Sequence, residues 1–208
     1  MRKPKGYQSK PRNTGSKNRR PLLLLAAEGK NKTETRYFRD FLDCGRCTVQ
    51  FARGNATDPV NMMKDLIAAY KEKGLEPELG DTAYCLIDTD TNPAKDAKIA
   101  EAEAMSDDNI KLIVSNPCFE IWFLCHFTYS TRQYRTSQEL VDTLNCPDML
   151  PGYSKADIST WKRLEGKMDN AIDNADRLKV FCEGIKAKPH TVAFGPSTEV
   201  TEIIRKFF

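Results

Sequence analysis

The stretch PLLLLAAEGKNKTETRYF, residues 21–38, decides the fold of this chain. Six apolar residues, 22–27, run directly into Glu28 and Gly29, and a polar turn and a helix-like segment from about Thr33 follow. A short apolar run that ends at a glycine turn before a helix is typical of the first strand of an α/β domain. Open α/β sheets place their sites at the carboxyl ends of buried strands. We therefore expect Glu28 to belong to a functional site.

The bulk composition indicates one globular domain. The chain has 208 residues, 40% hydrophobic and 29% charged, which is enough for a sizeable core. No apolar run approaches the roughly 18 residues that cross a membrane, so we expect no membrane partner. Seven cysteines are an odd number, and several lie in apolar runs. This usage suits a reducing compartment better than a disulfide framework, so we expect a cytoplasmic protein.

The charge is concentrated at the N-terminus. Residues 1–20 carry eight basic side chains and no acid, whereas the whole chain has a net charge of +3, so residues 21–208 carry 3 − 8 = −5. Pro, Gly, Ser and Asn fill the rest of the first segment, which predicts a disordered basic tail before one domain, residues 21–208. Such a tail either contacts nucleic-acid backbone or is a solvated leader that aids solubility.

Strand and helix patterns alternate through the first 127 residues. The predicted strands are 22–27, 48–52, 83–88 and 111–115, and the predicted helices are about 33–43, 59–73, 93–105 and 117–127. This order predicts an α/β fold with a mostly parallel, doubly wound, four-stranded sheet flanked by helices.

Helical patterns dominate beyond residue 128. We expect helices at 136–145, 157–183 and 198–207, a short strand at 190–194, and Ser197 and Thr198 as caps of the last helix. The second half is interpreted as a helical C-terminal elaboration of the same domain.

Acidic residues follow two of the predicted strands. Glu28 follows the first, and Asp88 and Asp90 follow the third. In a flavodoxin-like strand order these strands are neighbours, so the three carboxylates converge. Converging carboxylates repel one another unless a cation neutralises them, and all-oxygen sites suit Mg²⁺ or Mn²⁺. The alternative interpretation of the D-x-D pair is an ordinary turn or helix cap.

A glutamate-glycine pair after a first strand and a D-x-D after a later one resemble the Toprim fold of topoisomerases, bacterial primases and overcoming-lysogenization-defect nucleases. The fuller pattern resembles the RloB-like family, a Toprim-related group associated with abortive phage infection. The matching stretches, within about residues 22–205, are EGKNKTETRYF (28–38), LIDTDTN (86–92), SNPCFEIWFLCHF (115–127) and GPSTEV (195–200). Gly195 departs from the pattern, in which we expect asparagine.

The resemblance implies a Rossmann-like, Toprim-like fold with Glu28, Asp88 and Asp90 as catalytic residues and metal ligands. It also implies that Asn116 and Glu120 face the same site, where Glu120 as a fourth acid would hold a second ion. Two-metal sites suit phosphodiester cleavage, because one ion activates water and the other stabilises the leaving oxygen. The alternative role of Glu120 is a cap or salt bridge within its helix.

Three lysines, together with Asn116, are predicted to bind phosphate or nucleic acid. Lys30 and Lys32 lie in the turn after Glu28, and Lys155 lies in a Pro/Gly-broken loop. The alternative is that these lysines are ordinary solvated residues.

The resulting expectation is a Mg²⁺- or Mn²⁺-dependent nuclease, a hydrolase of antiviral defence that cuts DNA or RNA. From the resemblance alone, a partner ATPase is also expected. The alternative is a non-catalytic nucleic-acid-binding or regulatory subunit of a defence complex. Cys44 and Cys47 form a C-x-x-C without a second pair for zinc, and His126 is expected to pack or cap. The chain contains no Walker A motif or nucleophile elbow.

Overall fold

The structure is a computed structural model that describes residues 19–28, 32–42, 45–54, 56–155, 157 and 160–207, without the side chains of Lys32, Phe41 and Leu42. Most of the predicted tail, together with Lys30 and Cys44, lies outside these ranges. The roles predicted for those residues and for the Lys32 side chain therefore stay predictions.

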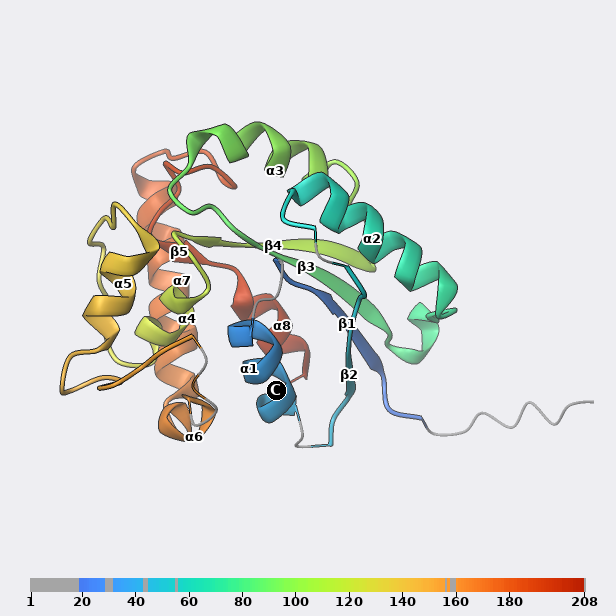
Figure 1. Cartoon of the computed structure of the whole chain (residues 1–208), viewed down its shortest axis with the longest axis horizontal. Coiled ribbons are helices and arrows are strands. Elements are labelled where there is room, and N and C mark those ends of the chain that lie inside the picture. The colour runs from blue at the N-terminus through green and yellow to red at the C-terminus, as the bar shows by residue number, and fades with distance from the viewer. Residues whose placement is uncertain are drawn as a thin grey trace, which may run out of the picture.

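Within the described residues, five strands form one sheet in the order β2-β1-β3-β4-β5 (Figure 1). The strands are β1 (Leu22–Ala26), β2 (Thr48–Phe51), β3 (Thr82–Asp88), β4 (Ile110–Asn116) and β5 (Ser197–Thr198). The first four are parallel, and β5 pairs antiparallel with β4. The mostly parallel α/β fold is confirmed with one strand more than expected. The predicted adjacency of the first and third strands is confirmed, because β1 pairs with β3.

Helices cover both faces of the sheet (Figure 1). One face carries α2 (Pro59–Glu72) and α3 (Asp96–Glu103). The other side carries α1 (Lys32–Leu42), α4 (Glu120–Cys125), α5 (Ser137–Leu144), α6 (Thr160–Leu164), α7 (Met168–Gly184) and α8 (Val200–Phe207). Two short 3₁₀ turns, η1 (Pro77–Leu79) and η2 (Pro93–Lys95), precede β3 and α3. A separate hydrophobic cluster fills the space on each face.

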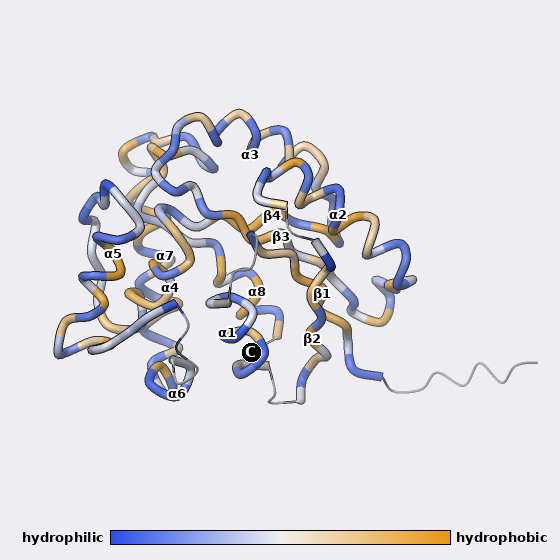
Figure 2. The backbone as a smooth tube through the Cα atoms, viewed as in Figure 1, coloured by the Kyte–Doolittle hydropathy of each residue, from blue (hydrophilic) through white to orange (hydrophobic). Residues whose placement is uncertain are grey.

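Local sequence explains the main elements. Every residue of β3 is buried, as its nearly continuous apolar run predicts for a central parallel strand. Helix α2 begins where Asp58 accepts a hydrogen bond from the backbone N–H of Asn61 and Pro59 fixes the first turn. Figure 2 shows the apolar strands β1, β3 and β4 at the centre, with polar stripes on the helices around them. Burial of these strands therefore fixes where their carboxyl ends meet.

Three predictions in the second half are wrong. Residues 190–194 form turns, and the short strand is β5 instead, at the two residues that pair with Ser115 and Asn116 of β4. Ser197 and Thr198 are therefore strand residues, although Thr198 Oγ1 also accepts a hydrogen bond from the N–H of Val200 at 3.4 Å. The predicted helix over 157–183 is two helices, α6 and α7, separated at Gly166, whose φ of 79° is left-handed.

Arg19 is part of the fold although the sequence placed it in the tail. Its guanidinium donates to both carboxylate oxygens of Asp81, at 2.8 and 2.6 Å. Asp81 is buried and also accepts from the backbone N–H groups of Leu22 and Glu76. These contacts join the segment before β1 to the segment before β3.

Among the described helices, none is long and apolar enough to cross a membrane. Cys85, Cys118, Cys125 and Cys182 are buried free thiols, which agrees with their position in apolar runs.

Candidate functional site

The structure brings the four predicted acids to one edge of the sheet. Glu28 follows β1, and Asp88 is the last residue of β3, with Asp90 two residues later. Glu120 is the first residue of α4, just after β4. Because β1, β3 and β4 are adjacent and parallel, their carboxyl ends meet at this edge. The convergence inferred from the strand order is therefore present.

A lysine that sequence reasoning did not single out links the outer part of this group. The Nζ atom of Lys95 donates to Oδ2 of Asp90 at 2.6 Å and to Oε2 of Glu28 at 3.2 Å. It also donates to the main-chain carbonyl of Asp88 at 3.1 Å. Burial opposes the charge of Lys95, but the carboxylates of Asp90 and Glu28 outweigh it and raise the pKa of the ammonium. One cation thus bridges two of the predicted ligands.

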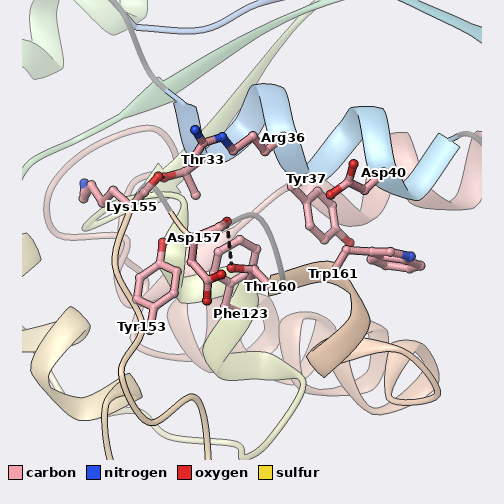
Figure 3. A pocket seen from close by; sticks show the side chains of 10 residues that line it. All are labelled: Thr33, Arg36, Tyr37, Asp40, Phe123, Tyr153, Lys155, Asp157, Thr160 and Trp161. Atoms are coloured by element: carbon pink, nitrogen blue, oxygen red, sulfur yellow. Dashed lines mark hydrogen bonds between the residues drawn. The ribbon is translucent and has the colours of Figure 1, made fainter.

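The inner part of the group centres on Glu120, which is only 1% exposed. Its Oε1 accepts from the hydroxyls of Tyr153, at 3.0 Å, and Thr33, at 3.4 Å. The Nζ atom of Lys155 lies 3.5 Å from the same oxygen. Figure 3 shows Lys155 beside Thr33 of α1, with Tyr153 on the same loop as Lys155. These contacts differ from the alternative of a salt bridge within helix α4, because all three partners of Glu120 lie outside that helix.

A fifth acid, Glu34, joins the inner part from the first turn of α1. Its side chain is 2% exposed. Burial and the negative charges of Glu120 and Glu28 raise the pKa of Glu34 to about 8. The only sequence feature that could have identified Glu34 as a site residue was its position in the same stretch as Glu28. A glutamate in the first turn of a helix is usually explained by the helix dipole, so that signal was weak.

Asp88 lies between the two parts. Burial, followed by the negative charges of Glu34, Glu120 and Asp90, raises the pKa of the Asp88 carboxyl well above its usual range. Like charges held together in a dry site cost free energy unless protons or cations neutralise them. Five acids and two lysines meet here, so the carboxylates outnumber the ammonium groups by three.

The backbone of the D-x-D turn is strained. Asp90 and Thr91 both have left-handed φ values, 50° and 53°, which residues other than glycine rarely adopt. The turn is held by the Asp90 N–H, which donates to the Pro117 carbonyl at 2.9 Å, and by Thr91 Oγ1, which donates to the Arg135 carbonyl at 2.8 Å. Strain of this kind persists where surrounding structure enforces it, and it clusters at functional sites.

Asn116 is placed differently from its prediction. It ends β4 and is buried, but its amide nitrogen donates to the carbonyls of Thr191 and Val192, at 3.2 and 2.9 Å. This amide holds the turn before β5, whereas the acids are contacted by Lys95 and Lys155. Of the predicted phosphate-binding lysines, the structure therefore places Lys155 at the acids. Lys30 and the side chain of Lys32 lie outside the described residues.

His126 packs, as the sequence predicted. It is buried, its Nδ1 lies 2.9 Å from the Trp122 carbonyl, and its ring contacts the Trp122 ring edge-on at 4.9 Å between centroids. Burial lowers its pKa to about 4, so the ring stays neutral near pH 7.

A small cavity of about 10 Å³ lies between α1 and α6 (Figure 3). Thr33, Tyr37, Tyr153, Lys155 and Trp161 are among the residues that line it. A volume of this size accommodates about one water molecule. Water therefore has room beside Tyr153 and Thr33, the two side chains that donate to Glu120.

The chemistry of these side chains fits a hard divalent cation. Carboxylate and carbonyl oxygens of Glu28, Asp88 and Asp90 already surround one cation, the ammonium of Lys95. In the described part of the chain, however, no three acid, cysteine or histidine side chains are gathered closely enough to enclose one metal ion. Any ion at this edge would therefore require the acid side chains and Lys95 to rearrange.

Comparisons with known proteins give one result. Searches of curated proteins and of solved structures found no match. The family model described as RloB-like protein matches residues 23–207, nearly the whole chain. The chain belongs to the RloB-like protein family.

Proposed function

We propose that this protein is a metal-dependent nuclease that hydrolyses phosphodiester bonds of DNA or RNA. The observation that carries the proposal is the convergence of five acids, Glu28, Glu34, Asp88, Asp90 and Glu120, at the carboxyl edge of three adjacent parallel strands. Open α/β sheets place their ligands at this edge. Glu34, Asp88 and Glu120 are buried, and a group with excess negative charge is suited to binding the cations that phosphodiester hydrolysis also needs.

Mg²⁺ or Mn²⁺ is the proposed cofactor. Glu28 and Asp90 would hold it in the outer part, and Glu34, Asp88 and Glu120 would hold a second ion in the inner part. Divalent ions at such sites activate water and stabilise the leaving oxygen. Tyr153 and Thr33 orient the Glu120 carboxylate, and Lys155 supplies a positive charge beside it for a substrate phosphate.

A basic segment beside the acids would contact a nucleic-acid substrate. Residues 127–136, between α4 and α5, contain Arg132 and Arg135 and no acid, and both arginines are exposed. The Arg135 carbonyl accepts from Thr91 in the D-x-D turn, so this segment adjoins Asp90. Arginines placed in this way suit contacts to phosphate. The basic tail would add contacts that do not depend on nucleotide sequence.

The test is cleavage of short DNA and RNA strands, single- and double-stranded, with Mn²⁺ or with chelator. Wild type is expected to cut at least one of these in Mn²⁺ alone, and Glu28→Gln is expected to lose about 100-fold or more in rate. Equal rates for wild type and Glu28→Gln would sink the proposal.

The second candidate function is a non-catalytic nucleic-acid-binding or regulatory subunit. The observation that favours it is that lysines already neutralise some of the acids, Lys95 at Glu28 and Asp90 and Lys155 at Glu120. This candidate predicts salt-sensitive nucleic-acid binding that survives Asp88→Asn with Asp90→Asn but weakens when residues 1–20 are removed. Calorimetry that detects no binding of Mn²⁺ would favour it over the nuclease.

The biological setting is proposed from family membership. An abortive-infection role in the cytoplasm, together with a partner ATPase, would be tested by phage plating on cells that carry wild type or Glu28→Gln. Protection that depends on Glu28 is the expected result. Equal plating with both forms would contradict it.

A further inference from the structure

Lys95 occupies an oxygen-lined position inside the acid group. Its side chain is 17% exposed, and its Nζ lies within 3.4 Å of four oxygens, two from Glu28, one from Asp90 and the main-chain carbonyl of Asp88. An ammonium surrounded by anionic and carbonyl oxygens has the surroundings that a hard metal ion prefers.

The local structure around Lys95 places its side chain next to the acids. Lys95 ends the η2 turn, five residues after Asp90. Pro93 begins that turn, and the Asn92 side chain accepts from the N–H of Ala94 at 3.1 Å, which fixes its start. Such a short, capped connection keeps the ammonium within reach of the D-x-D turn.

A neighbouring lysine shows that this placement is particular to Lys95. Lys98 is three residues further along, and its side chain is 54% exposed. Its Nζ pairs with Asp58 at the start of α2, at 2.6 Å. Of the two lysines on this segment, one therefore enters the acid group and the other pairs outside it.

We propose that Lys95 is a tethered counter-ion that a divalent cation displaces from the outer part of the site. This inference rests on the proposed metal site. Glu28 and Asp90 cannot direct the same oxygens at an ammonium 2.6 to 3.2 Å away and at a metal ion without strong repulsion between the two cations. Lys95 and a metal ion therefore compete for these oxygens.

Two consequences follow from this competition. In metal-free protein, Lys95 screens the repulsion between carboxylates and so stabilises the fold. The apparent affinity for metal is reduced by the fraction of molecules in which Lys95 has left the oxygens. Metal binding and the position of one side chain are thereby coupled.

The test is calorimetric titration of Mn²⁺ into wild type, Lys95→Met and Lys98→Met, with melting temperatures measured in chelator. Lys95→Met is expected to bind Mn²⁺ about tenfold more tightly, because it removes the competitor, and to melt at a lower temperature without metal. Lys98→Met removes the same charge outside the site and is expected to bind Mn²⁺ as wild type does. Mn²⁺ binding by Lys95→Met that equals or falls below that of wild type would overturn the proposal.

A second measurement uses the unaltered protein, in case Lys95→Met does not fold. Acetylation of individual lysines is followed by mass spectrometry with and without Mn²⁺. The acetylation rate of Lys95 is expected to rise on addition of Mn²⁺, while that of Lys98 stays constant. If calorimetry shows that the protein binds Mn²⁺ and the acetylation rate of Lys95 does not rise, the proposal that metal displaces Lys95 is overturned. If wild type and both variants all fail to bind Mn²⁺, the proposed metal site is overturned as well.

Discussion

The phenolic hydroxyl of Tyr153 donates a hydrogen bond to Oε1 of Glu120 at 3.0 Å, and both side chains are buried. Burial and the Glu120 charge raise the pKa of Tyr153, so the phenol remains a proton donor throughout the ordinary pH range. The contact ties the loop after α5 to the first residue of α4. It therefore sets the position of an acid that the strand order alone does not fix.

Tyr153→Phe is expected to lower the free energy of unfolding by about 1–3 kcal/mol, because a buried carboxylate loses a donor. Denaturant unfolding with an unchanged m-value would measure this loss. In Glu120→Gln the same substitution is expected to cost less, since the charge that the hydroxyl contacts is gone. Equal costs in the two backgrounds would contradict the proposed coupling.

His190 predicts a pH dependence of stability. Its two ring nitrogens lie 3.0 Å from Glu103 and 2.8 Å from Glu199. Burial opposes protonation, but the hydrogen bonds and charges of Glu199 and Glu103 outweigh it and raise the pKa of His190 to about 9. Since the folded pKa exceeds the ordinary value near 6.5, the stabilisation is complete below about pH 6.5 and is lost as pH rises through about 9.

The difference in unfolding free energy between wild type and His190→Asn is therefore expected to be largest at pH 6. It should shrink by about 3 kcal/mol between pH 6 and pH 10. Thermal or denaturant unfolding across this range measures it. A difference that stays constant would show that the imidazole is not preferentially protonated in the folded protein.

Gly195 is expected to resist enlargement. A Cβ atom at this position would lie 2.5 Å from Nδ2 of Asn116, whose amide is held by two hydrogen bonds. Gly195→Ala should therefore destabilise the protein by about 1–3 kcal/mol through overpacking. Gly184→Ala is the matched control, because nothing lies within 4 Å of its added Cβ atom. Equal stability of the two variants would contradict this account.

The tail is expected to separate into a part that binds nucleic acid and a part that stabilises the fold. Removal of residues 1–18 deletes six basic side chains but keeps Arg19 on Asp81. It should reduce the salt dependence of nucleic-acid affinity and leave the melting temperature unchanged. Adding Arg19→Met to this deletion should lower the melting temperature, because buried Asp81 loses its bidentate partner. A melting temperature already lowered by the first deletion would contradict this division.

Sequence patterns predicted the sheet well because its central strands are nearly continuous apolar runs. The adjacency of β1 and β3, and hence the meeting of Glu28 with Asp88 and Asp90, followed from one assumption about strand order. The misplaced strand had a different cause. Residues 190–194 include Thr191, Val192 and Phe194, which are types that favour strands, but pairing with β4 at 115–116 selects 197–198 instead.

The details of the site depend on contacts between residues distant in sequence. Glu34 resembles any helix-opening acid until Glu120 is placed beside it by packing of α1 against α4. Lys95 lies in a polar segment that predicts a solvated helix, and only the fold shows its ammonium among the acids. Asn116 was expected to face these acids, yet the 191–192 turn, 75 residues away, takes its amide. No local pattern encodes such pairings.

The most direct test of the central claim is the rate of Mn²⁺-dependent cleavage by Glu34→Gln beside that of Asp40→Asn. Both residues lie on α1, but only Glu34 is buried among the other acids. If five acids form one hydrolytic centre, Glu34→Gln should lose about 100-fold or more in rate, while Asp40→Asn cleaves as wild type does. Undiminished cleavage by Glu34→Gln, or cleavage by wild type that persists in chelator, would contradict the account.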